Sequence, residues 1–268
     1  MLRYLINPPN IITSASLFCG FYSMVLASRA GGDPYQLYLS GLFIMLAAVF
    51  DGLDGRVARW TGTASDFGVQ YDSLSDVISF GVAPAFLLYQ WTLSELGNVG
   101  LVACFAFAMC GAMRLARFNI TTSIIPKGFS QGLTITQSAG MLAAAVVFNY
   151  RVLDGQVHNP RLVLAAVVGF SLLMISSVWF RTFKDLKMNR WGMSLVGGIL
   201  LSMAVLWFRT HEFAWIFVVY PTLHVASGLL EDVLRYARGR THSQLIAEYQ
   251  AAQALEDAED EVEELVHQ

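Results

Sequence analysis

The stretch DGLDGRVARWTGTASDFGVQYDSLSD, from Asp51 to Asp76, holds five aspartates within 26 residues. The segments on both sides of it are apolar enough to lie in a lipid bilayer. Carboxylates are costly in such surroundings unless another group pairs with them or neutralises them. A feature that collects this much negative charge at one point of a membrane chain is therefore the first thing to explain.

The composition of the 268 residues is that of an integral membrane protein. Hydrophobic residues make up 55% of the chain and charged residues only 14%, whereas about 25% of the residues in a soluble domain are charged. The three cysteines stand apart, and neither they nor the five histidines show the spacing of metal ligands. The sequence therefore indicates neither a disulfide framework nor a zinc site.

Apolar runs long enough to cross a bilayer as helices recur along the chain. Spanning takes about 20 residues, and only helices are expected, because an open strand edge in lipid leaves backbone groups unpaired. The sequence thus predicts an all-α, polytopic membrane helix bundle of about eight spans, near residues 10–28, 36–55, 69–91, 98–116, 132–150, 161–180, 192–209 and 213–236.

The distribution of basic residues predicts the orientation of this bundle. With both termini in the cytoplasm, 13 of the 17 Lys and Arg fall on the cytoplasmic side, and the remaining four, Arg29, Arg151, Arg161 and Arg209, fall on the other. An excess of basic residues marks cytoplasmic segments. The aspartates then lie at the cytoplasmic mouth of the second and third spans.

The last 28 residues differ from the rest of the chain. Residues 241–268 carry eight acidic residues and no Lys or Arg, a pattern typical of a solvated helix or a disordered extension. We therefore predict a transmembrane domain over residues 1–240 and an acidic cytoplasmic tail over residues 241–268.

Two pairs of aspartates in the opening stretch have helical spacing. Asp51 and Asp54 are three residues apart near the end of the second span, and Asp72 and Asp76 are four apart at the start of the third, so each pair shares a helix face. Four converging carboxylates repel one another unless cations neutralise them. Mg²⁺ and Mn²⁺ prefer oxygen ligands, and two such ions can clamp a phosphoryl group. The pattern predicts such a site.

The other residues of the stretch fit around these acids. Asp66 follows Ser65 just before the third span and is expected to be a helix N-cap. Arg59 offers a planar fork suited to a phosphate. Small residues thin the helix surface, so that a flat group can approach closely: Gly52, Gly55, Ala58 and Gly68.

The spacing D-x2-D-G-x2-A-R-x8-G-x3-D-x3-D is met in full by Asp51, Asp54, Gly55, Ala58, Arg59, Gly68, Asp72 and Asp76. This pattern resembles the signature of the CDP-alcohol phosphatidyltransferases. Eight fixed positions within 26 residues make the match highly specific. The resemblance implies a helical membrane fold, commonly dimeric, with two divalent ions at the four aspartates and a CDP-linked lipid donor.

The resemblance also implies a role for each matching residue. The metal ligands would be Asp51, Asp54, Asp72 and Asp76, with Asp76 also acting as the base. The CDP-lipid pocket would be lined by Gly55, Ala58, Arg59, Ser65 and Gly68, and by Asn10 and Thr13, whose sequence NIIT resembles an N-terminal Asn-x-x-Thr element of the family.

Further stretches resemble the phosphatidylserine synthase branch of the family, which implies serine as the acceptor. They include PNIITSASLFCGFYSM in the first span, DSLSDVISFGVAPAFLLY in the third, RLARFN at 114–119 and LMISSVWFRTFKDL at 173–186. The chain departs from the branch at Thr134 and Thr136, where two prolines are expected. This difference bears on a helix kink near the acceptor pocket.

A serine pocket needs a cation for the carboxylate of the amino acid. Arg114 and Arg117 are three residues apart at a helix end beside the predicted site, and Asn119 follows them, so a carboxylate-binding role suits these residues. The two arginines suit equally well the role of basic anchors at a cytoplasmic helix end.

Two other functions compete with serine transfer. The same chemistry could use glycerol 3-phosphate, an inositol phosphate or choline as the acceptor. In a different class, the carboxylates could form the cation site of an ion-coupled transporter. Such carriers often have internal repeats and sites near the bilayer midplane, whereas this sequence shows no repeat and places its acids at helix ends.

Overall fold

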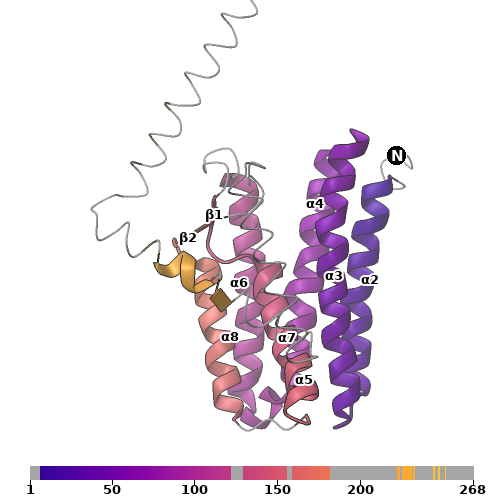
Figure 1. Cartoon of the computed structure of the whole chain (residues 1–268), viewed down its shortest axis with the longest axis vertical. Coiled ribbons are helices and arrows are strands. Elements are labelled where there is room, and N and C mark those ends of the chain that lie inside the picture. Colours follow the sequence, from indigo (N-terminus) through magenta and orange to yellow (C-terminus); the bar gives the residue numbers. More distant parts are fainter. Residues whose placement is uncertain are drawn as a thin grey trace, which may run out of the picture.

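The computed structural model describes residues 7–121, 129–155 and 159–181, with further positions at 222–223, 225–230, 232, 244, 247 and 251. Within these residues the chain forms a bundle of helices that run up and down along one axis (Figure 1). In chain order the elements are α2 (Pro8–Arg29), α3 (Pro34–Thr61), α4 (Asp66–Asp76), η1 (Val77–Val82), α5 (Ala83–Trp91), η2 (Leu93–Leu96), α6 (Asn98–Thr121), β1 (Phe129–Gln131), α7 (Ile135–Val152), α8 (Pro160–Ile175) and β2 (Trp179–Arg181).

Helices occupy the six predicted spans that the described residues cover. Of these helices, α2, α3 and α6 are long and apolar enough to cross a bilayer, and α8 is a shorter apolar helix. The chain is therefore a mostly helical membrane protein. The predicted spans at 192–209 and 213–236 and the acidic segment 241–268 lie outside the described residues, apart from isolated positions.

The turn between α3 and α4 contains the residues that end α3 and begin α4. Gly62 follows the end of α3 with a φ of +63°, a left-handed conformation that glycine adopts at little cost. The Ser65 hydroxyl then accepts a hydrogen bond of 3.1 Å from the Gly68 amide and caps α4. The prediction that Asp66 is the N-cap was wrong by one residue, because the Ser65 side chain fills that role and Asp66 begins the helix.

The third predicted span contains a π-helical turn. Helix α4 runs through η1 into α5 without a break, and the Ala83 amide bonds to the carbonyl of Ile78, five residues earlier. Pro84 follows, and it has no N–H to donate to the Phe80 carbonyl one α-helical turn earlier. The extra residue in this turn lies directly after Asp76, and such turns are frequent near functional sites.

Small polar residues lock α2 against its neighbours. Ser23 and Ser40 share a buried hydrogen bond of 2.8 Å between α2 and α3, and Ser79 of η1 donates to the Ser16 carbonyl over 3.2 Å. Gly20 faces Ser79, and a Cβ at Gly20 would lie only 2.6 Å from the Ser79 Cα. Because α2 packs on both α3 and α4, these contacts set the register of the helices that carry the aspartates.

One end of the bundle departs from the helix-only prediction. Helix α8 ends at Ile175, whereas the sixth span was predicted to reach residue 180. The chain then forms β2, which pairs antiparallel with β1, so that Ser130 lies opposite Phe180. This two-stranded ribbon lies beside the upper ends of α6 and α8 (Figure 1). Since Thr134 caps α7 by accepting from the Gln137 amide, the threonine found in place of proline gives that helix its start.

Candidate active site

Three carboxylates meet between α3 and α4. Asp51 comes from α3, and Asp72 and Asp76 lie one turn apart on α4. Each offers an oxygen, and these oxygens lie within 4.8 Å of one another. Asp76 is the most buried of the three, with 8% of its surface exposed. Two helices that are antiparallel and share a short turn therefore bring together acids up to 25 positions apart.

Asp54 lies beside this cluster and is held by the first helix. The Thr13 hydroxyl of α2 donates to the Asp54 carboxylate over 2.7 Å, and Asp54 is 5% exposed. Of the four predicted metal ligands, three share one group and Asp54 borders it. Thr13 was predicted to line the CDP-lipid pocket, and its bond to Asp54 gives it the further task of orienting a carboxylate.

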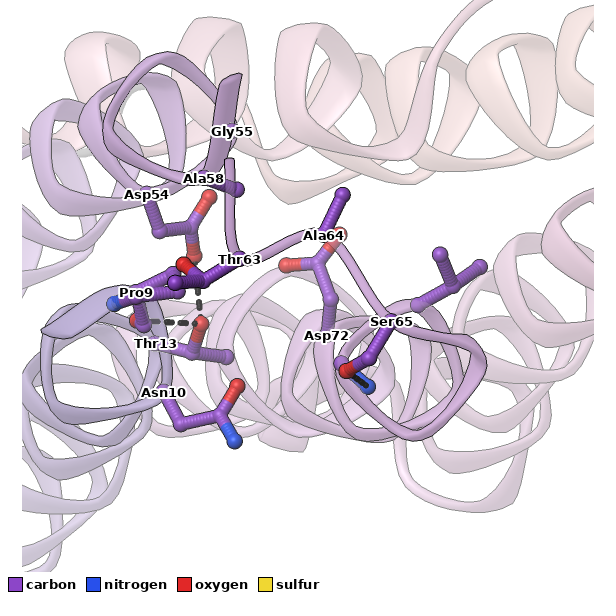
Figure 2. Close-up of a pocket in the computed structure, with 12 residues that line it drawn as sticks. Pro9, Asn10, Thr13, Asp54, Gly55, Ala58, Thr63, Ala64, Ser65 and Asp72 are labelled. Carbon is purple, nitrogen blue, oxygen red and sulfur yellow. Dashed lines mark hydrogen bonds between the residues drawn. The ribbon is translucent and has the colours of Figure 1, made fainter. Parts of the chain in front are cut away.

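A pocket opens next to the acids between α2, α3 and α4 (Figure 2). Six of the seven residues predicted for the CDP-lipid line it: Asn10, Thr13, Gly55, Ala58, Ser65 and Gly68. Asp54 and Asp72 reach into the pocket from α3 and α4. The pocket and the carboxylate cluster therefore form one continuous surface, with Asp72 common to both.

The glycines of the pocket have different surroundings. A Cβ added to Gly55 would meet nothing within 4 Å, so this side of α3 is open to a ligand. A Cβ at Gly68 would lie 3.3 Å from the Ser65 hydroxyl and 3.5 Å from the Asn10 side-chain oxygen. Gly68 therefore leaves room for the Ser65 cap of its own helix and lets α4 lie close to Asn10 of α2.

The remaining predicted pocket residue, Arg59, is exposed and is not among the residues that line the pocket. It directly follows Ala58, which is. Four lining residues escaped the sequence analysis: Pro9, Thr63, Ala64 and Val69. Thr63 and Ala64 lie in the turn between α3 and α4, which each carry part of the aspartate motif. Their place between the two parts of the motif could have identified them.

Arg114 is buried near the acids. It is 6% exposed, and its Nη2 donates to the Ser130 hydroxyl over 2.8 Å. The Phe118 ring lies beneath the guanidinium, 5.3 Å from it, and Asp76 is close enough to attract it electrostatically. Arg114 Nε has no hydrogen-bond partner in the part of the chain that the structure describes. A buried donor of this kind suits an anionic ligand.

The other two predicted acceptor residues contact the protein itself. Arg117 donates to the carbonyls of Gln131, Met174, Ile175 and Ser176, so its guanidinium ties α6 to the end of α8. Asn119 donates to the Ser73 hydroxyl over 3.0 Å and joins α6 to α4 beside Asp72. These contacts give both residues a structural role next to the site.

Comparison with known proteins identifies the family. The family described as CDP-alcohol phosphatidyltransferase matches residues 6–170, which include the cluster, the pocket and all the helices that form them. The chain belongs to the CDP-alcohol phosphatidyltransferase family. It is therefore a membrane phosphatidyltransferase.

Three relatives within the CDP-alcohol phosphatidyltransferase family share one name. Each is named CDP-diacylglycerol–serine O-phosphatidyltransferase. The Helicobacter pylori protein is 34% identical over 80% of this chain and 88% of its own length. That of Methanocaldococcus jannaschii is 38% identical over 69% and 78%, and that of Bacillus subtilis is 30% identical over 68% and 97%.

The donor set at the cluster fits the divalent metal of this phosphatidyltransferase family. The three grouped ligand atoms are all carboxylate oxygens. Such oxygens suit hard cations such as Mg²⁺ and Mn²⁺, whereas thiophilic cations prefer sulfur ligands. Without a cation, three carboxylates this close would repel one another strongly. The residues present therefore fit a divalent metal.

Proposed function

We propose that this protein transfers the phosphatidyl group of CDP-diacylglycerol to the hydroxyl of L-serine, which gives phosphatidylserine and CMP. The observation that carries the proposal is the cluster of Asp51, Asp72 and Asp76, which shares Asp72 with a pocket lined by six family positions. The names of the three relatives support serine as the acceptor.

The donor binds between α2, α3 and α4. The open side of Gly55 and the small Ala58 admit the flat nucleotide, while Asn10 and Ser65 offer polar groups to it. Arg59, beside Ala58, meets a phosphate of the donor from the exposed end of α3. The acyl chains stay in the bilayer, which explains why the enzyme is built from membrane helices.

The acids hold the metal. Asp51, Asp72 and Asp76, with Asp54 beside them, would hold two divalent ions, Mg²⁺ or Mn²⁺. When bound, such ions neutralise the charge of the pyrophosphate and stabilise the departing nucleotide. Thr13 keeps the Asp54 carboxylate in a fixed orientation through its 2.7 Å hydrogen bond.

Asp76 is the base of the reaction. Its carboxylate accepts the proton of the serine hydroxyl. The serine oxygen then forms a bond to the phosphorus that carries diacylglycerol. The bond from that phosphorus to the CMP oxygen breaks, and its electron pair leaves with CMP. Asp76 is 8% exposed, so little of its side chain faces bulk water.

Arg114 holds the carboxylate of the acceptor. It is the buried cation near Asp76, and its Nε offers a donor to which the described part of the protein presents no acceptor. In this arrangement the acceptor's hydroxyl would meet Asp76 and its carboxylate would meet Arg114. Arg117 and Asn119 hold the end of α6 that carries Arg114 against α8 and α4 through their bonds.

The proposal includes the architecture that this reaction requires. We infer eight spans, a homodimer, and a site and two termini that face the cytoplasm, with residues 1–240 as the catalytic domain and 241–268 as a separate acidic tail. The basic residues at the site end of the bundle, such as Arg56, Arg59 and Arg117, support this orientation.

An acceptor screen tests the assignment. Purified protein is given CDP-diacylglycerol and Mn²⁺ with serine, glycerol 3-phosphate, an inositol phosphate or choline, and CMP release is measured. We expect release that depends on serine alone. Release that is independent of serine, or that another acceptor supports better, would contradict the choice of acceptor.

Substitution of Asp76 tests the mechanism. We expect Asp76→Asn to lower kcat by about 10²–10⁴-fold, because the amide cannot accept the proton. Asp66→Asn is the matched control, since Asp66 is exposed in the first turn of the same helix and does not line the pocket. A fully active Asp76→Asn variant would show that another group is the base.

A further inference from the structure

The two-stranded ribbon brings one hydroxyl to the buried guanidinium of Arg114. Ser130 lies in the middle of β1 and is 2% exposed. Its oxygen accepts the 2.8 Å hydrogen bond from Arg114 Nη2, and its hydroxyl can donate to the Gly132 carbonyl, 3.5 Å away. Phe118 therefore lies beneath the guanidinium and Ser130 at one edge of it, and among the described residues nothing bonds to its Nε.

The ribbon itself is held rigidly in place. Arg117, one turn beyond Arg114 on α6, bonds to the Gln131 carbonyl of β1 and to three carbonyls at the end of α8. Gly132 has a φ of +74°, and a Cβ there would overlap the Met174 carbonyl. The Gly132 amide also bonds to the Val178 carbonyl over 2.8 Å. Ser130 thus sits on a fixed support rather than on a loose loop.

We propose that Ser130 is a positioning residue for the acceptor, which aims Arg114 at the carboxylate of serine. This inference rests on the proposed function. An arginine side chain has several rotatable bonds and loses rotamer freedom when it is fixed. The bond from Nη2 to Ser130 fixes the plane of the guanidinium before the acceptor arrives. The acceptor therefore binds to an arginine that is already oriented.

A purely structural role for Ser130 makes a different prediction. If the hydroxyl only stabilised the ribbon, its loss would lower the melting temperature and would affect both substrates alike. A positioning role instead weakens the interaction with one substrate. The separation of the two KM values is therefore the measurement that distinguishes these roles.

The experiment compares Ser130→Ala, Ser130→Thr and Ser171→Ala in the full-length protein. Ser171 is a matched control, because it is also buried and its hydroxyl donates only within its own helix, to the Val167 carbonyl. CMP release is measured with serine varied at saturating CDP-diacylglycerol, and then the reverse. Melting temperatures are measured alongside.

We expect Ser130→Ala to raise the KM for serine about tenfold, with little change in the KM for CDP-diacylglycerol. Ser130→Thr restores the hydroxyl and should recover most of the affinity, while Ser171→Ala should behave as wild type. An unchanged KM for serine in a folded Ser130→Ala variant overturns the inference and leaves the proposed function intact. If wild-type CMP release does not depend on serine, both fail.

Discussion

Gly52 and Gly55 stand three residues apart on α3, and a Cβ added to either would have nothing within 4 Å. Only Gly55 lines the pocket. The two positions thus offer the same freedom to accept a side chain, but a different relation to the proposed nucleotide site. This contrast separates the effect of filling the pocket from the effect of changing the helix.

We expect Gly55→Leu to lower kcat/KM for CDP-diacylglycerol about 10²-fold, because the new side chain occupies the space into which the donor must fit. Leucine is a better helix former than glycine, so the melting temperature should not fall. Steady-state kinetics and thermal unfolding in detergent measure both effects.

Gly52→Leu is the control for this substitution and should keep near wild-type activity. Equal losses in the two variants would show that α3 tolerates no added bulk, and that the open side of Gly55 is not where the donor binds.

The sequence was informative about residues whose partners lie close along the chain. Asp72 and Asp76 share a helix face because of their spacing alone. The bond between Thr13 and Asp54 joins residues 41 positions apart, and it depends on the packing of α2 on α3. Arg117 was ambiguous for the same reason, because the α8 carbonyls that it contacts are more than 50 positions away.

At the scale of elements, α2 lies very close to the π-helical turn η1 at Gly20. A Cβ at Gly20 would lie 2.6 Å from the Ser79 Cα and 2.7 Å from the Ser79 hydroxyl oxygen. Backbone atoms cannot move aside as the end of a side chain can. An added methyl group must therefore separate α2 from η1, which follows Asp76 directly.

We expect Gly20→Ala to destabilise the protein by about 1–3 kcal/mol through this overpacking and to lower its melting temperature. Activity should fall as well, because Thr13 on α2 orients Asp54. Gly140→Ala in the middle of α7 is the control: a Cβ there meets nothing within 4 Å, and its melting temperature should stay level or rise. A Gly20→Ala variant as stable as wild type would mean that the two helices are not in close contact.

The same element shows where helix prediction from sequence reached its limit. Apolar runs of about 20 residues located six helices, because burial in lipid forces the backbone to bond within itself. The register of the π-helical turn depends on one missing amide, at Pro84. The ribbon of β1 and β2 pairs segments about 50 positions apart. The residues at 129–131 and 179–181 form no local pattern that predicts this pairing.

At the scale of the whole molecule, the bundle has two distinct ends. Thr61 closes α3 at the site end, whereas Glu95 lies in the η2 turn between α5 and α6 at the opposite end (Figure 1). Both residues are exposed. The three native cysteines, Cys19, Cys104 and Cys110, are buried, so they should give little background with a polar thiol reagent.

These positions make the orientation of the molecule testable. A maleimide that cannot cross membranes should label Glu95→Cys in intact cells, and should label Thr61→Cys only after the cells are opened. The physical reason is that the site end carries basic residues, Arg56 and Arg59 among them, which are retained on the cytoplasmic side. The reverse labelling pattern would place the carboxylates and the pocket on the outer face, where a cytoplasmic supply of nucleotide-activated lipid could not reach them.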